Sequence, residues 1–321
     1  AGKGKRMKSK QYKVLHPVCA KPMIDHVMDA LDQSGADQIV TVVGHGAEAV
    51  KEHLRQRTSY ALQEEQLGTG HAVLQAEKVL AGKKGTTIII CGDTPLVTAE
   101  SIKGMLQVHN EQQAAATIMT AHMDNPKGYG RIVRDGQNTV SKIVEQKDCT
   151  EAEDKITEIN TGTYCFDNQK LFAALKQVTN DNAQQEYYLT DVIAILKQQN
   201  ERIEGYAIQD ADEGKGINDR VALAEAEKIM RERIVKRHLL AGFTVIDPAS
   251  TYIDASCVIG PDTVIYPGCH IRGNSQIGSG SVIGPNAEII DSSIGDRVTV
   301  KQSVITESKV ESDTSIGPFA Y

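Results

Sequence analysis

The stretch TYIDASCVIGPDTVIYPGCHIRGNSQIGSGSVIG, residues 251–284, decides the fold of the C-terminal part of the chain. It places an isoleucine at every sixth position, a period that fits neither a helix face nor simple strand alternation. The six-residue step runs through Ile253, Ile259, Ile265, Ile271, Ile277, Ile283 and Ile289, and resumes after one break at Val298, Val304, Val310 and Ile316. It predicts a parallel β-helix, in which each hexapeptide supplies one short strand and one turn and the isoleucine points inward. A β-sandwich does not require so fixed a period.

The extent of this β-helix follows from the repeat length. β-Helices of the hexapeptide type are left-handed and use three hexapeptides in each coil, so residues 251–317 span about four coils. We therefore assign residues 242–321 to a partial left-handed parallel β-helix. A helical pattern at 219–241 precedes it and is interpreted as a linking helix.

Working towards the N-terminus, residues 22–110 alternate between helix and strand patterns. Apolar strand-like runs that alternate with helices imply a sheet covered by helices on both faces. Residues 1–218 are thus expected to form an α/β, Rossmann-like domain with a mixed, mostly parallel sheet. The predicted helices cover 22–35, 47–56, 72–80, 168–178, 188–199 and 219–238, and the predicted strands cover 39–43, 59–62 and 86–91, with a hairpin at 132–144.

Charge is distributed unevenly along the chain. The chain carries 35 basic and 42 acidic residues, but without residues 1–13 the balance is 29 to 42, a net charge of −13. Such a chain is not a general nucleic-acid binder, and its local positive charge favours a small anionic ligand. Six cysteines without a CxxC pair indicate reduced thiols of a cytoplasmic protein, and we expect Cys91 and Cys165 to lie in the core.

The positive charge lies in AGKGKRMKSKQYK, residues 1–13, beside two glycines. Glycine lets backbone amides approach phosphate oxygens, and nearby lysine and arginine neutralise them. The segment is neither a P-loop nor a Rossmann GxGxxG sequence, and by itself it fits a solvated terminus equally well.

Two further stretches favour a ligand site. Asp93 follows a buried strand, at the carboxyl end where open α/β sheets bind ligands, and a lone carboxylate there is typical of a Mg²⁺ site. A helix N-cap or turn residue is the alternative interpretation of Asp93. In EEQLGTGHA, residues 64–72, two glycines could bring the backbone against a flat base, although the same residues also fit a plain tight turn.

Taken together, these motifs resemble the bacterial family of bifunctional N-acetylglucosamine-1-phosphate uridylyltransferases and glucosamine-1-phosphate N-acetyltransferases. The resemblance covers all 321 residues. It is carried, in the order found in the family, by AGKGKRM, EEQLGTGHA, CGDTPL (91–96), GYGRIV (128–133), VEQKDCT (144–150), EINTG (158–162), NDNAQQEYYLTD (180–191) and GINDR (216–220).

The resemblance implies transfer of a uridylyl group from UTP to N-acetylglucosamine 1-phosphate, giving UDP-N-acetylglucosamine and pyrophosphate. It also implies Mg²⁺ as the cofactor and a homotrimer, without nucleic-acid or membrane partners. The implied catalytic residues are Arg6 and Lys13, and the implied metal ligands are Asp93 and Asn218. The implied substrate-binding residues are Ala1, Gly2, Lys3, Lys13, Gln63, Gly68, Thr69, Cys91, Gly92, Gly130, Glu145, Asn160, Glu186, Tyr187 and Asn218.

The chain departs from the family pattern in three places. Lys5 replaces the usual threonine of the glycine loop, and the strand that normally precedes this loop is absent. The sequence also stops at Tyr321, so acetyl-CoA binding and N-acetyltransferase activity are expected only in a full-length chain. On this interpretation the sequence is truncated at both ends.

Two other functions stay open at this point. The chain could be another sugar-1-phosphate nucleotidylyltransferase with a hexapeptide tail, which would share the glycine loop and the metal-binding aspartate. It could also be a non-catalytic scaffold, although the presence of Arg6, Lys13, Asp93 and Asn218 together argues against that.

Overall fold

The computed structural model describes residue 2 and residues 4–321, and the chain forms two compact units. The first unit comprises Ala1–Leu15 and Met23–Asp219, and the second comprises His16–Pro22 and Arg220–Tyr321. The chain therefore leaves the first unit after Leu15, contributes His16–Pro22 to the second unit, and returns to the first unit at Met23. The sequence did not suggest this path. Within the described part of the chain, no helix has the length and apolar character needed to cross a membrane.

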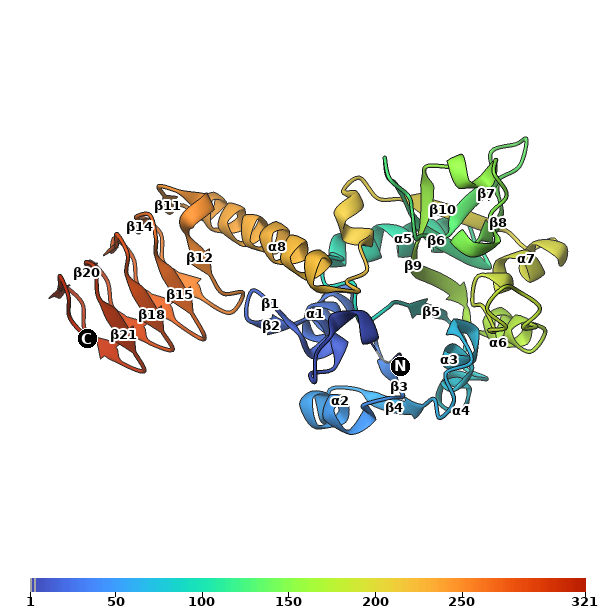
Figure 1. Ribbon diagram of the computed structural model, residues 1–321, viewed down its shortest axis with the longest axis horizontal. Coiled ribbons are helices and arrows are strands. Elements are labelled where there is room, and N and C mark those ends of the chain that lie inside the picture. Colours follow the sequence, from blue (N-terminus) through green and yellow to red (C-terminus); the bar gives the residue numbers. More distant parts are fainter. Residues whose placement is uncertain (1, 3) are drawn as a thin grey trace. The chain divides into compact units, whose positions relative to one another are not determined.

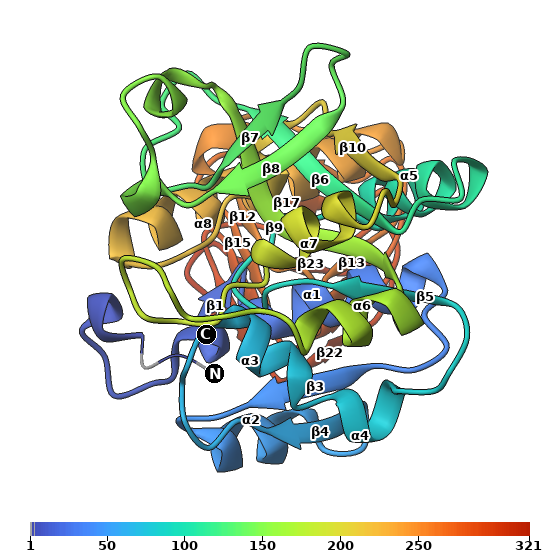
Figure 2. The same cartoon turned by 90° about the vertical axis from the view of Figure 1, so that its right-hand side faces the viewer.

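The first unit is built around a six-stranded mixed sheet (Figures 1 and 2). Its strand order is β10-β6-β9-β7-β8, with β5 also paired to β9. The strands are β5 (Thr86–Ile89), β6 (Ala116–His122), β7 (Arg131–Arg134), β8 (Val140–Val144), β9 (Glu158–Asp167) and β10 (Ile203–Ala207). A separate parallel pair joins β3 (Val40–Val43) to β4 (Ser59–Leu62).

Helices cover both faces of the six-stranded sheet. Successive residues of β6 show this, because Ile118 packs in a core that includes α6 and α7, whereas Met119 packs in a core that includes α1 and α5. The helices of this unit are α1 (Met23–Ser34), α2 (Ala47–Leu54), α3 (Thr69–Leu74), α4 (Glu77–Leu80), α5 (Ala99–Glu111), α6 (Asn168–Leu175) and α7 (Asp191–Gln198). Short 3-10 turns are η1 (Lys5–Met7), η2 (Lys13–Leu15), η3 (Gln146–Asp148), η4 (Glu153–Lys155) and η5 (Ala211–Gly214).

Helix α1 shows how the sequence pattern produces the local structure. Its apolar residues recur at helical spacing, and Met23, Val27 and Met28 are each at most 3% exposed. Gly35 then adopts a φ of +86°, and its N–H bonds to the carbonyl of Asp32, which ends the helix. The predicted hairpin is confirmed as well, because β7 and β8 pair in antiparallel register.

Two predictions for this unit need correction. The predicted mixed sheet is confirmed, but it is not mostly parallel. Within the described residues of the six-stranded sheet only β6 and β10 pair in parallel, because the long strand β9 lies between β5 and β6 and runs against both. The helix predicted at 72–80 is in fact two helices, α3 and α4. The first of these starts earlier, at Thr69, whose hydroxyl accepts a hydrogen bond from the Leu189 N–H at 3.0 Å.

The second unit begins with helix α8 (Arg220–Leu240) and the hairpin β1 (Pro17–Val18) and β2 (Lys21–Pro22). The turn residues Cys19 and Ala20 both have positive φ values, as a tight two-residue hairpin turn requires. Glu227 of α8 accepts a hydrogen bond from the Cys19 N–H at 2.6 Å, and the Cys19 carbonyl accepts one from Ala255. The hairpin is therefore held by α8 and by the first coil of the β-helix.

The remaining strands form the predicted parallel β-helix, with successive rungs visible in Figure 1. Three sheets have the orders β11-β14-β17-β20-β23, β12-β15-β18-β21 and β13-β16-β19-β22, so each strand pairs with the third strand after it. The strands are β11 (Thr244–Val245), β12 (Tyr252–Ile253), β13 (Val258–Ile259), β14 (Val264–Ile265), β15 (His270–Arg272), β16 (Gln276–Ile277), β17 (Val282–Ile283), β18 (Glu288–Ile290), β19 (Ser293–Ile294), β20 (Thr299–Val300), β21 (Val304–Thr306), β22 (Lys309–Val310) and β23 (Ser315–Ile316), and η6 (Pro248–Ser250) lies between β11 and β12.

Isoleucine side chains stack through the centre of this β-helix. Ile253, Ile271, Ile289 and Ile305 are consecutive partners in one sheet, and all four are at most 6% exposed. A stack of identical branched side chains fills the interior of each coil, which explains why the six-residue step is so regular.

The predicted inward positions beyond Ile289 are partly wrong. The step shortens to five residues at Ile294, at Ile305 and at Val310, so the inward residue of β21 is Ile305 and not Val304. Val298 is fully buried but precedes β20, where Val300 points inward. Shorter turns between strands therefore changed the phase, while Val310 and Ile316 keep the positions that were predicted.

The corrected register is testable with neighbouring residues of one strand. We expect Ile305→Ala to lower the free energy of unfolding of the β-helix by about 2 kcal/mol or more, because it removes a buried side chain and leaves a cavity. Val304→Ala, which changes a half-buried outward side chain, is the matched control and should have a clearly smaller effect. Urea denaturation measures both. A larger loss for the Val304 variant would contradict the register.

Candidate active site

Three distant segments meet at the side chain of Lys13. Lys13 starts η2, Asp93 follows β5, and Asn218 lies just before α8. The Lys13 Nζ forms an ion pair with the Asp93 carboxylate and donates a hydrogen bond to Asn218 Oδ1 at 3.0 Å. The side chains of the ion pair are 19% and 16% exposed, so this cluster is shielded but reachable by a ligand.

Backbone contacts hold these side chains in place. The Ile217 N–H bonds to the Asp93 carbonyl at 2.8 Å, which brings the neighbouring Asn218 beside Asp93. Gly92 is closely packed here, because a Cβ at this position would lie 2.8 Å from the Ile24 Cδ1, so the end of the Ile24 side chain would have to move. The strand pattern alone favoured a site at Asp93, and the family resemblance paired Asp93 with Asn218. The structure adds the backbone contact that brings the two residues together.

The glycine loop lies at the start of the chain. Met7 of η1 is 1% exposed and anchors this loop, while Gly2 and Arg6 are exposed. Gly4 has a φ of +56°, and a Cβ there would lie 3.0 Å from the Lys13 Cβ. The loop is therefore packed against Lys13. Ala1 and Lys3, also predicted to bind substrate, lie outside the described residues.

The predicted base-binding residues form a second group. Gln63 follows β4 and is only 3% exposed, and its Nε2 donates to the Gly68 carbonyl at 3.1 Å. Two backbone hydrogen bonds, Gly70 N–H to Tyr187 O and Tyr187 N–H to Leu67 O, join this loop to the segment after Glu186. Gly68 has a φ of +116° and a Cβ would come within 2.6 Å of the Tyr187 carbonyl, so only glycine fits.

The predicted sugar-binding residues form a third group. A Cβ on Gly130 would lie 3.6 Å both from Glu145 Oε2 and from the Asn160 Cβ, so these three residues adjoin one another. The Asn160 N–H also bonds to the Gly130 carbonyl at 2.9 Å. The arrangement offers a carboxylate and an amide beside a bare stretch of backbone, which suits hydroxyl and acetamido groups.

Burial is the main influence on the Glu145 carboxyl. Desolvation raises its pKa, and the nearby carboxylates of Asp148, Asp191 and Glu186 raise it further, against a hydrogen bond from the Thr190 hydroxyl at 3.3 Å that lowers it. Burial likewise raises the pKa of Asp191. A carboxylate held in an unfavourable environment is typical of a binding site.

Cys91 corrects the expectation of a core thiol, because it is exposed at the end of β5. A Cβ at Gly162 would lie 3.7 Å from its sulfur, so Cys91 lies beside the loop that follows Asn160. Cys165 is fully buried as predicted, and all six cysteines are free.

Sequence reasoning missed the residues that support the site. Tyr164 accepts a hydrogen bond from the Asn160 Nδ2 at 2.6 Å, and Asn182 uses its side chain to bond the Glu186 N–H and carbonyl. Their sequence positions carry no functional signal, because each acts through a contact made only in the folded chain.

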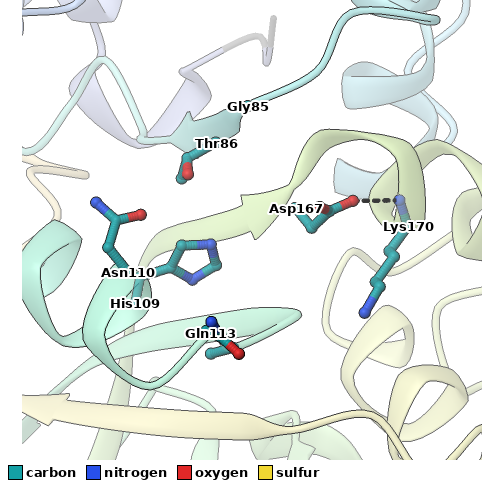
Figure 3. A pocket seen from close by; sticks show the side chains of 8 residues that line it. Gly85, Thr86, His109, Asn110, Gln113, Asp167 and Lys170 are labelled. Carbon is teal, nitrogen blue, oxygen red and sulfur yellow. Dashed lines mark hydrogen bonds between the residues drawn. The ribbon is translucent and has the colours of Figure 1, made fainter.

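Other features of the described residues do not compete with this site. Figure 3 shows a pocket near the start of β5, lined by residues that include Thr86, His109 and Asp167. It contains none of the predicted site residues, and His109 there bonds to Thr117 at 3.0 Å. Among residue 2 and residues 4–321, no group of three or more His, Cys, Asp or Glu side chains could hold a metal.

Comparison with known proteins defines the class first. The family model described as "Nucleotidyl transferase" matches residues 1–215, and that described as "Bacterial transferase hexapeptide (six repeats)" matches residues 256–291. The solved structure of apo UDP-glucose pyrophosphorylase has a TM-score of 0.56 at 17% identity, covering 73% of this chain and 96% of that one. The chain is thus a nucleotidyltransferase with a hexapeptide-repeat β-helix.

Curated relatives identify the family within this class. The bifunctional GlmU proteins of Halalkalibacterium halodurans, Pediococcus pentosaceus and Geobacillus sp. are 56%, 57% and 58% identical to this chain over 321 residues. These matches cover all of this chain and 70%, 69% and 70% of the relatives, respectively. The chain belongs to the bifunctional GlmU family.

The chain carries the uridylyltransferase part of this family and is a UDP-N-acetylglucosamine pyrophosphorylase. The family uses UTP and N-acetylglucosamine 1-phosphate in this part, and acetyl-CoA in its acetyltransferase part. The family is generally dependent on Mg²⁺. Identities above one half over the whole chain favour this activity over the two alternatives, another nucleotidylyltransferase or a scaffold.

The half-buried Glu145 carboxyl predicts opposite effects on stability and binding. Folding raises the pKa of Glu145, so ionisation of this carboxyl destabilises the folded state. This loss of stability is absent at pH values below the ordinary carboxyl pKa and is complete above the raised pKa. Glu145→Gln should therefore raise the Tm near neutral pH, with the gain disappearing in acid. The same variant should raise the KM for the sugar phosphate about tenfold or more, because a charged hydrogen-bond acceptor is lost.

Thermal unfolding at several pH values and steady-state kinetics measure these two effects. Glu151→Gln, an exposed carboxyl in the same region, is the control and should change neither. The quantity to compare is the change in Tm that Glu145→Gln causes relative to the parent. If this change is lower at neutral pH than at acid pH, the assigned direction of the Glu145 pKa shift is wrong.

Proposed function

We propose specific roles for these residues in the uridylyl transfer. The observation that carries the proposal is the convergence of Lys13, Asp93 and Asn218 on one point from three segments of the chain. The glycine loop carries positive charge next to that point, which suits a triphosphate. The base and the amino-sugar are assigned to the two neighbouring groups of residues.

The reaction needs positioning and charge neutralisation more than acid–base chemistry. A phosphate oxygen of N-acetylglucosamine 1-phosphate attacks the α-phosphorus of UTP, and the bond from this phosphorus to the bridging oxygen of the β-phosphate breaks. The nucleophile is already an anion, so the site does not require a serine, cysteine or histidine base. Pyrophosphate leaves with the bonding electron pair.

Charged residues of the first segment are assigned to the phosphates. Gly2, Lys3 and Arg6 hold the departing pyrophosphate, and Lys13 neutralises the α-phosphate as its charge changes. Lys5 replaces the threonine usual in this loop and is exposed, so it adds one further positive charge near the triphosphate.

The remaining residues are assigned to the two organic groups. Gln63, Gly68 and Thr69 bind the uracil, together with Ala1 and the backbone of Cys91 and Gly92. The amino-sugar is assigned to Gly130, Glu145, Asn160, Glu186 and Tyr187. The Glu145 carboxylate accepts hydrogen bonds from sugar N–H or O–H groups, which is consistent with its shielded position.

Asp93 and Asn218 are proposed to hold Mg²⁺. The donor set fits, because both residues offer oxygen atoms and Mg²⁺ commonly takes only one or two protein oxygens. The structure supplies a further indication, since the positively charged Lys13 Nζ lies against both of these side-chain oxygens. When bound, Mg²⁺ would supply positive charge to the phosphate oxygens of the nucleotide.

Assembly, domain boundaries and location complete the proposal. We infer a catalytic domain at 1–218, a linking helix at 219–241 and a left-handed β-helix at 242–321, in a cytoplasmic homotrimer. The family's β-helices pack three abreast, and the outer surface here exposes Ile246 (53%), Val258 (60%) and Tyr266 (40%). Ile246 and Tyr266 follow the paired strands β11 and β14 and so lie side by side, and adjoining exposed apolar side chains favour an association surface.

The function is tested by pyrophosphate release from UTP. We expect release that depends on both N-acetylglucosamine 1-phosphate and Mg²⁺, and a loss of about a hundredfold or more in kcat for Asp93→Asn, because a metal ligand is weakened. Circular dichroism of the variant checks that the fold is kept. Equal turnover of the variant and the parent would rule out the assignment of Asp93.

The contact of Lys13 with both proposed metal ligands predicts competition between the two cations. In the absence of nucleotide, Lys13→Met should bind Mn²⁺ about tenfold or more tightly than the parent, because the competing ammonium is removed. Electron paramagnetic resonance of free Mn²⁺ measures this affinity without any turnover. Lys10→Met, an exposed lysine of the same segment, is the control. Unchanged or weaker Mn²⁺ binding by the Lys13 variant would disprove the competition.

The proposed trimer predicts a sedimentation coefficient that rises with protein concentration towards the trimer value, because three β-helices bury one another's surfaces. Analytical ultracentrifugation of the chain over a wide concentration range measures it. The full-length protein should form the same trimer. A monomer at every concentration of the full-length protein would refute the trimer.

A further inference from the structure

The side-chain amide of Gln63 is fixed by two neighbours. Its Nε2 lies 3.1 Å from the Gly68 carbonyl oxygen and 3.2 Å from His71 Nδ1, and the residue is 97% buried. A carbonyl oxygen can only accept a hydrogen bond, so the atom that faces Gly68 must be the amide nitrogen. This settles which way round the Gln63 amide lies.

The same geometry fixes the role of His71. Both ring nitrogens of His71 face an amide nitrogen, and a neutral ring accepts from only one of them. An unpaired N–H costs more free energy at the buried Gln63 than at the half-buried Gln75, which favours the tautomer in which Nδ1 accepts from Gln63 and Nε2 carries the proton. Gln75 Nε2 lies 3.1 Å from the second ring nitrogen, but it donates its hydrogen bond to the His71 carbonyl at 2.9 Å and forms none with the ring in this tautomer. The hydrogen bond with Gln63 is therefore the one that involves the His71 ring.

The orientation leaves one hydrogen-bonding atom of Gln63 for a ligand. Within the described part of the chain, the side-chain hydrogen bonds of Gln63 use only its nitrogen, which leaves Oε1 as an acceptor. Uracil presents an N–H donor at N3, whereas cytosine presents an unprotonated acceptor at the same position. A fixed acceptor at Gln63 Oε1 therefore distinguishes the two bases. Uracil donates a hydrogen bond to it, whereas cytosine places a second acceptor against it, and such a repulsive or unpaired contact costs far more free energy than a good contact gains.

We propose that His71 is a positioning residue that sets the preference for a uracil base by holding the Gln63 amide with Oε1 towards the nucleotide. The inference rests on the proposed role of Gln63 as a base-binding residue and adds the group that orients it. Without His71, one N–H of a buried amide has no acceptor, and the energy that keeps the amide in this orientation falls.

The test compares UTP with CTP as substrates. His71→Leu removes the acceptor at nearly constant volume, and we expect the ratio of kcat/KM for UTP to that for CTP to fall about tenfold or more. His71→Asn keeps an acceptor oxygen near the position of Nδ1 and should retain most of the preference. Calorimetric binding of UTP and CTP gives a second measurement that does not depend on turnover, and His71→Ala replaces the leucine variant if that one does not fold.

Outcomes for the two residues can be told apart. If Gln63→Leu lowers the UTP preference while His71→Leu and His71→Ala do not, the positioning role is overturned and the base site stands. If Gln63→Leu leaves the preference unchanged, the proposed base site itself is wrong. Equal loss of UTP and CTP turnover in the His71 variants, with a constant ratio, also overturns the proposal, because it shows only a structural role.

Discussion

A single lysine side chain joins three distant parts of the sequence at the active site. Lys13 lies 80 residues from Asp93 and 205 residues from Asn218, yet its Nζ contacts both. The ion pair gathers the glycine loop, the end of β5 and the segment before α8 around one point. The proposed sugar group lies close to this junction in the sheet, because Asn160 is part of β9, which pairs with β5.

The same junction explains how charge is managed in a chain with a net charge of −7. An unpaired carboxylate at this point would repel a triphosphate. The ammonium of Lys13 neutralises Asp93 in the structure, and under the proposed roles both groups would be available for nucleotide and metal. In the proposed sugar group, desolvation and the neighbouring carboxylates raise the pKa of Glu145, so its ionised form lowers the stability of the folded chain.

Local sequence patterns predicted those parts of the fold that depend on local repetition. The isoleucine period gave the β-helix, and the apolar spacing of residues 23–31 gave α1. The pattern failed after Ile289, because a turn shortened by one residue changes which side chain points inward and leaves no local mark. It also could not show that β9 lies between β5 and β6, since strand order is decided by long-range packing.

The residues of the candidate site likewise fall into those that the sequence could predict and those that it could not. Asp93 and the two glycine-containing loops were recognisable from their residues, and the family resemblance supplied Glu145, Asn160 and Asn218. The supporting residues Tyr164, Thr190 and His71 could not be predicted, because each works through a hydrogen bond to a residue that only the fold brings near. The exposure of Cys91 was likewise hidden, since an apolar run does not show where its strand ends.

The most direct test of the central role of Lys13 is a pair of crystal structures, one without ligand and one with Mg²⁺ and UTP. We predict that Lys13 Nζ contacts Asp93 and Asn218 in the first. In the second, the metal should be bound by Asp93 and Asn218, with Nζ moved to a phosphate oxygen. A metal bound elsewhere, with Lys13 still paired to both residues, would contradict this description of the site.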